Sequence, residues 1–102
     1  MDAKKVLEVI SVYRNHFESL KLNKIDFKHQ AFVPDLPRKM EDRLTLGHCY
    51  GMLDQMEKFV AEGRMEKVFR WLGFIQGCLW SAGHYNLEEL KNQNRPDGNA
   101  GK

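Results

Sequence analysis

The most regular apolar pattern in the chain runs from Met65 to Trp80. A helix of about 3.6 residues per turn over this stretch places most of its large side chains on one broad face. The side chains expected on that core face are Met65, Val68, Phe69, Leu72, Ile75, Leu79 and Trp80. Apolar residues continue past it, to Trp71, Phe74 and Cys78 beside Arg70. This apolar surface is wider than one neighbouring helix needs, so we expect a second body to cover the remainder.

Another helix is predicted from Asp2 to about Leu20, because its apolar residues fall on one stripe. That stripe contains Val6, Val9, Ile10, Tyr13, Phe17 and Leu20. His16 lies at the edge of the stripe and is expected to be a half-buried boundary residue rather than a ligand. Residues 21–37 show no helical period and contain two prolines, so they are predicted to form a long ordered connection.

The next helix is predicted to begin at Pro37 or Arg38 and to end near Glu62, with Gly63 in the left-handed conformation that follows many helices. Its expected core stripe contains Leu46, Cys49, Leu53, Met56 and Val60. On another side, Met40, Leu44, Gly47 and Gly51 form a row with little bulk at its far end. Because glycine destabilises a helix, a packing reason for this row is expected.

Only Gly63 and Arg64 separate this helix from the one over residues 65–80, which predicts a tight antiparallel hairpin. Equal distances from the turn pair Cys49 with Cys78, and Gly47 with the ring of Trp80. We interpret the two cysteines as neighbouring buried thiols, with a disulfide or a metal site as the alternative. Gly73 and Gly77 have G-x-x-x-G spacing, which fits close approach by the first helix or by a second copy of the chain.

Gly83 is expected in the same left-handed conformation at the end of the helix over residues 65–80. A short fourth helix is predicted after it, because Asn86 and Glu89 have the spacing of a capping box. Tyr85 and Leu90 could form the accompanying hydrophobic staple. The predicted fold is therefore an all-α bundle, built on a helix hairpin, with a single domain over residues 1–93 and a flexible tail over residues 94–102.

Composition agrees with one globular domain of 102 residues, 42% apolar and 29% charged. The formal charge of +2 is too small to indicate a nucleic-acid or membrane partner. No signal-peptide core or bilayer-spanning run is apparent, and the two cysteines do not have the spacing of a secreted framework. We therefore expect an intracellular protein.

Positive charge is nevertheless concentrated around the long connection. The candidate residues for a nucleic-acid or acidic-partner surface are Lys21, Lys24, Lys28, Arg38 and Lys39. A solvated surface over a packed loop explains the same residues, and we favour that interpretation.

Motifs for chemistry are not found. The chain contains no nucleotide-binding glycine loop, H-E-x-x-H motif or EF-hand loop. His48 with Cys49, and Cys78 with His84, have the residue types of a zinc site, but adjacent ligands on a helix diverge by about 100°. We expect no catalytic residue, no metal and no cofactor, and a small metal protein or enzyme is kept only as a second alternative.

Surface recognition is the remaining class of function. Arg70, Trp71 and Phe74 are residue types that dominate binding hot spots, and they lie away from the predicted core face. Either the rest of the chain covers them, or they form an interface with a second copy or with a host protein. We take these three residues as the candidate protein-binding site.

The second half of the chain resembles a recurrent block in small uncharacterised proteins of tailed bacteriophages. The residues that carry the resemblance are Met65–Lys67, Arg70–Gly77, Leu79, Trp80, Gly83, Tyr85, Glu89, Leu90 and Asn94–Pro96. The first 40 residues contribute nothing to it. The resemblance implies a viral accessory protein and nothing about its mechanism. We expect a non-enzymatic protein in the cytoplasm of the infected host that acts through contacts with a host or phage protein.

Overall fold

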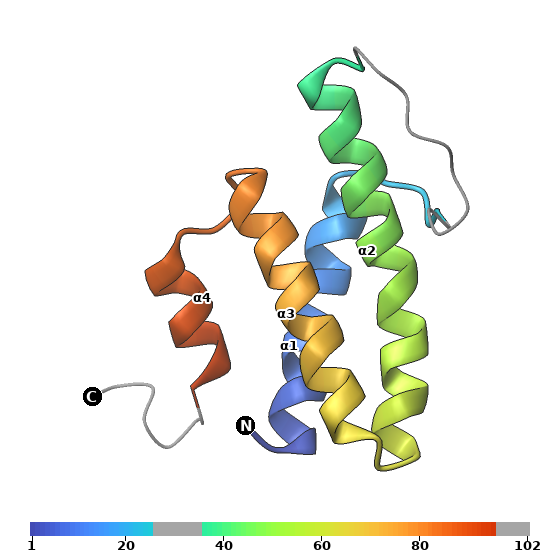
Figure 1. Ribbon diagram of the computed structural model, residues 1–102, viewed down its shortest axis with the longest axis vertical. Helices are drawn as coiled ribbons and strands as arrows, with labels where there is room; N and C mark the ends of the chain where they lie inside the picture. The colour runs from blue at the N-terminus through green and yellow to red at the C-terminus, as the bar shows by residue number, and fades with distance from the viewer. Residues whose placement is uncertain (26–35, 96–102) are drawn as a thin grey trace.

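The computed structural model of the chain describes residues 1–25 and 36–95. In these ranges the chain forms the helices α1 (Ala3–Ser19), α2 (Arg38–Ala61), α3 (Met65–Ser81) and α4 (Leu87–Asn94), and no strand (Figure 1). The prediction of a small all-α bundle is confirmed. Most of the predicted connection, with Lys28, and most of the predicted tail lie outside the described residues.

Helices α2 and α3 form the predicted antiparallel hairpin, and α2 also packs along α1 (Figure 1). The short helix α4 returns to contact α1. The core is formed by apolar side chains of the first three helices and by Leu22, the third residue after α1. They are Val6, Val9, Ile10, Tyr13, Phe17, Leu22, Leu46, Cys49, Leu53, Met56, Phe59, Val68, Leu72, Ile75 and Leu79.

The buried stripe of α3 is narrower than the sequence pattern predicted. Val68, Leu72, Ile75 and Leu79 are buried, but Phe69 is 41% and Trp80 is 53% exposed, so their assignment to the core is wrong. The physical reason is that periodicity gives the direction of an apolar face and not its width, which depends on how many neighbours pack on it. The buried stripe of α2 matches the prediction except at its end, where Phe59 is buried and the predicted Val60 is only half-buried.

The first three helices end in the same way. After α2 and α3, Gly63 (φ 74°) and Gly83 (φ 79°) adopt the left-handed conformation, as predicted. Lys21 does the same after α1, with φ 56°. Its N–H donates to the carbonyl of Glu18 at 3.0 Å, and the N–H of Leu22 donates to that of Phe17 at 3.4 Å. This is a Schellman motif with a lysine at the position that glycine usually occupies.

Gly47 is approached closely by the backbone of residues 23–25 and not by the ring of Trp80. The N–H of Ile25 donates to the carbonyl of Gly47 at 3.1 Å, and a Cβ on Gly47 would lie 2.7 Å from the carbonyl oxygen of Asn23. The expected contact with Trp80 is therefore wrong, although the expectation of a packing reason for the glycine is confirmed. The chain after α1 crosses α2 at this point, where Lys24 and Ile25 also lie close to Gly51.

Helix α4 begins with the predicted capping box, in which Asn86 Oδ1 accepts from the N–H of Glu89 at 2.8 Å and Glu89 Oε1 accepts from the N–H of Asn86 at 3.0 Å. Its far end is tied to the bundle by a side-chain network. Gln76 of α3 donates to the Tyr13 hydroxyl of α1 at 3.1 Å and to Asn94 Oδ1 at 2.6 Å. The same hydroxyl donates to Gln93 Oε1.

Candidate protein-interaction surface

The side of α3 that faces away from the core carries an unusual set of residues. We call this surface the α3 outer face and define it by Phe69, Arg70, Gly73, Phe74, Gly77 and Trp80, all of which are exposed. This face points away from the bundle, because the buried residues of α3 lie on the opposite side of the same helix. In Figure 1, α3 passes in front of α1.

Two glycines form the middle of this face. Within the described part of the chain, no atom apart from the adjoining turns of α3 itself lies within 4 Å of a Cβ built on Gly73 or Gly77, and both have ordinary helical backbone. The first helix therefore does not approach them, which removes one of the two explanations for their spacing. The exposed backbone forms a low strip that another molecule could approach closely.

Aromatic side chains stand on both sides of the strip. Phe74 is 52% exposed and lies on the side of α2, where its ring meets His48 edge-on with centroids 6.4 Å apart. Phe69 and Trp80 lie together on the opposite side, since at about 100° per residue their directions differ by only about 20°. The sequence pattern missed these two residues because it placed them in the core.

Trp71, the third predicted contact residue, has a different environment. Its ring packs edge-on against Phe59 of α2, with centroids 5.0 Å apart, and Lys67 Nζ lies 5.7 Å from its ring centre. Trp71 is half-buried and packs against the hydrophobic core. It therefore belongs to the interface between α2 and α3, whereas Arg70 and Phe74 lie on the α3 outer face.

A groove of about 460 Å³ borders the glycine strip between the first half of α2 and the second half of α3. Its lining includes Gly73, Gly77 and Ser81 of α3 and the acidic residues Glu41 and Asp42 of α2. Arg38 spans its end, donating through Nε to Asp42 at 3.0 Å and through Nη2 to the carbonyl of Ser81 at 3.1 Å.

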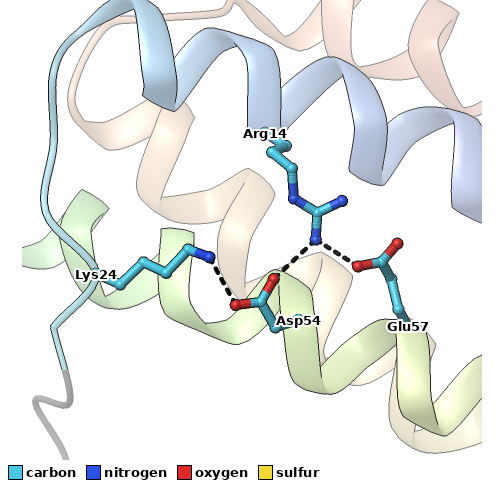
Figure 2. Close-up of polar contacts among 4 residues, drawn as sticks. All are labelled: Arg14, Lys24, Asp54 and Glu57. Atoms are coloured by element: carbon cyan, nitrogen blue, oxygen red, sulfur yellow. Dashed lines mark hydrogen bonds and ion pairs between the residues drawn. The ribbon is translucent and has the colours of Figure 1, made fainter.

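Several of the basic residues near the connection are paired within the molecule. Lys24 Nζ lies 2.8 Å from Asp54 Oδ2, and Arg14 contacts both Asp54 and Glu57 (Figure 2). The hydrogen bond from Lys24, followed by that from Arg14, lowers the pKa of the Asp54 carboxyl. These pairs are largely solvent-exposed and add little stability, but they reduce the positive field of this region.

The other basic candidates are placed as follows. Arg38 is paired with Asp42, Lys21 follows α1, and Lys39 is exposed in the first turn of α2. Lys28 lies outside the described residues. The described basic candidates therefore lie on different elements of the fold. Lys24 and Arg38 are paired with carboxylates, so less positive charge is available to bind a phosphate backbone than the sequence suggested.

Cys49 and Cys78 are neighbours, as the hairpin register predicted, and both are free thiols. The hydrogen bond between them, together with burial, raises the pKa of Cys49. The same hydrogen bond lowers the pKa of Cys78, which is half-buried and borders the groove. Cys49 is fully buried and thus acts as a small apolar residue of the core.

His16 has a partner that the sequence did not reveal. Its Nε2 lies 2.7 Å from Nδ1 of His84, and the ring of Tyr85 packs beside it with centroids 5.3 Å apart. No spacing rule links two residues so distant in the chain. Within residues 1–25 and 36–95, no group of three or more His, Cys, Asp or Glu side chains is arranged to hold a metal ion.

The described helices include none that is both long and apolar enough to cross a bilayer. We compared the chain with protein-family models, curated proteins and solved structures, and found no significant match in any of the three.

Proposed function

We propose that this chain is a non-enzymatic accessory protein of a tailed bacteriophage that acts by binding another protein through the α3 outer face. The phage assignment rests on the resemblance of residues 65–96 to phage proteins. Such a protein would work in the cytoplasm of the infected bacterium, where it would modulate or inhibit a host protein or a defence system. No cofactor is required for this function.

The observation that carries the proposal is the exposure of three large aromatic side chains on one helix face, at 41% for Phe69, 52% for Phe74 and 53% for Trp80. Covering a Phe or Leu side chain completely is worth about 1.5–3 kcal/mol, so covering the exposed half of each ring is worth about 1 kcal/mol. Together with the adjacent Arg70, this is the composition of a binding hot spot.

Capture from bacterial cells tests the proposal. The bait is the full chain, compared with the F74A/W80A variant, which removes two rings of the α3 outer face. The matched control is Leu87→Ala, because Leu87 is 58% exposed on α4 and is not part of that face. Circular dichroism establishes that all three baits are equally helical.

We expect the wild-type chain and L87A to recover the same specific partner, and F74A/W80A to lose it. Each partner is then purified and titrated against the three proteins, with a reduction in affinity of about tenfold or more expected for the double variant. Equal binding by all three proteins, or the absence of any specific partner, would contradict the proposal.

A further inference from the structure

The α3 outer face is complementary to itself. The glycine strip lies at its centre, and the point midway between Gly73 and Gly77 is at the level of residue 75. Phe69 and Trp80 lie on one side of the strip, about six residues before and five residues after that level. Phe74 lies on the other side, almost at the central level. A face with this layout can meet a copy of itself.

We infer that the α3 outer face binds a second copy of the chain, with the two α3 helices antiparallel and related by a two-fold axis through the level of residue 75. This inference deepens the proposed function, since it depends on that face being a binding surface. In an antiparallel pair, residues whose numbers sum to about 150 lie opposite each other. Phe69 then faces Trp80 of the second copy, and the glycine strips meet at the centre.

The remaining aromatic residue fits the same arrangement. A two-fold axis that lies in the interface, perpendicular to the helices, keeps each side of the strip on the same side in both copies. Phe74 of one copy therefore meets Phe74 of the other, in a pair that can adopt the offset or edge-on geometry favoured by rings.

Charge favours this orientation. Arg70 of one copy reaches the level of residue 80 in the other, where the groove beside Gly77 and Ser81 carries Glu41. Glu41 is exposed, and its neighbour Asp42 is already paired with Arg38. The two-fold axis forms this Arg70–Glu41 contact twice. A parallel pair would instead bring the two Arg70 side chains to the same level of the interface, away from Glu41, which is less favourable.

The area of the α3 outer face indicates how tightly two copies are expected to associate. An aromatic residue buries about 150–250 Å² when fully covered, so three half-exposed rings contribute about 300 Å² per copy. With the glycine strip and the groove rim this remains below the roughly 800 Å² per partner of a standard stable interface. We therefore expect a dissociation constant of about 10 to 100 µM rather than a permanent dimer.

Sedimentation equilibrium of the full chain, from about 1 to about 500 µM, measures this association directly. The steric variant is G73Q/G77Q, which places two bulky polar side chains on the strip. Because both positions are open in the monomer and glycine is a poor helix former, this variant should fold at least as stably as the wild type. We expect it to remain monomeric over the whole range.

Charge reversal gives an independent test. Arg70→Glu alone and Glu41→Arg alone should each weaken the dimer by about tenfold, because each change occurs twice in the two-fold interface. The variant that carries both changes should regain affinity to within about threefold of the wild type. L87A should dimerise like the wild type.

A monomeric wild-type chain at the highest concentration would overturn the inference, as would a dimer unaffected by G73Q/G77Q or a failure of the double charge reversal to restore affinity. The proposed function is judged separately. A monomeric chain that still captures another protein in a Phe74- and Trp80-dependent manner overturns only the homodimer, whereas loss of that dependence as well overturns both.

Discussion

His16 and His84 form a direct contact between α1 and the segment after α3, with 2.7 Å between Nε2 and Nδ1. At this distance one ring must donate a proton and the other must accept it, so at least one imidazole is neutral. Burial, followed by the charge of His84, lowers the pKa of His16 in the folded protein. The contact is therefore a source of pH-dependent stability.

The sign of this dependence follows from linkage. Because the pKa of His16 is lower in the folded than in the unfolded chain, the unfolded chain binds more protons as the pH falls. The stabilisation is present above the unfolded pKa of about 6.5 and is lost as the pH falls below it. We expect the free energy of unfolding, measured in urea, to decrease between about pH 7.5 and pH 5.5. His16→Gln should flatten this slope, and an equal slope in both proteins would exclude His16 as its origin.

Lys21 is expected to be suboptimal for stability. It is a non-glycine residue with a positive φ, at a helix end where Gly63 and Gly83 occupy the equivalent positions in α2 and α3. A side chain in the left-handed conformation costs about 1–2 kcal/mol, which glycine avoids. Lys21→Gly should raise the free energy of unfolding by about 0.5–1 kcal/mol, after allowing for the entropy of the unfolded chain. Lys21→Ala retains the Cβ and should give no such gain.

Glycines 47 and 73 both lie within helices, yet they should respond oppositely to alanine. At Gly47 a new Cβ would lie 2.7 Å from the Asn23 carbonyl oxygen and 2.9 Å from Ile25 Cδ1, so either the crossing segment or α2 must move. We expect Gly47→Ala to destabilise the protein by about 1–3 kcal/mol. Gly73→Ala meets open space and should stabilise it by about 1 kcal/mol. Thermal unfolding of the two variants provides the comparison, and a stabilising Gly47→Ala would contradict the observed close approach.

These glycines illustrate what the sequence could determine. Local signals, such as the capping box of Asn86 and Glu89 or the glycines that end α2 and α3, depend on a few adjacent residues and were predicted correctly. The pairing of Cys49 with Cys78 followed from the length of one short turn. The role of Gly47 required knowledge of where a non-helical segment crosses, and no periodicity contains that information.

The candidate site was predicted only in part for a related reason. Apolar periodicity shows which way α3 faces, but the number of neighbours decides how much of the apolar surface is covered. Phe74 and Arg70 were placed correctly outside the core, while Phe69 and Trp80 were assigned to it and Trp71 was not expected to pack on Phe59. The contact of His16 with His84 joins residues 68 positions apart and left no sequence signal.

The end of α4 is held to the bundle through the Tyr13 hydroxyl. The Tyr13 hydroxyl is buried, donates to Gln93 and accepts from Gln76, and burial raises its pKa to about 12. Tyr13→Phe removes the hydroxyl and leaves both amide groups without this partner, which should cost about 1–3 kcal/mol. Because the lost bonds fasten the end of α4, hydrogen exchange should accelerate most in residues 87–94 and much less in the hairpin. Tyr50→Phe is the control, since Tyr50 lies on α2 against Phe17 and Lys24. Uniform acceleration throughout the chain in Y13F would show instead that the network supports the whole core.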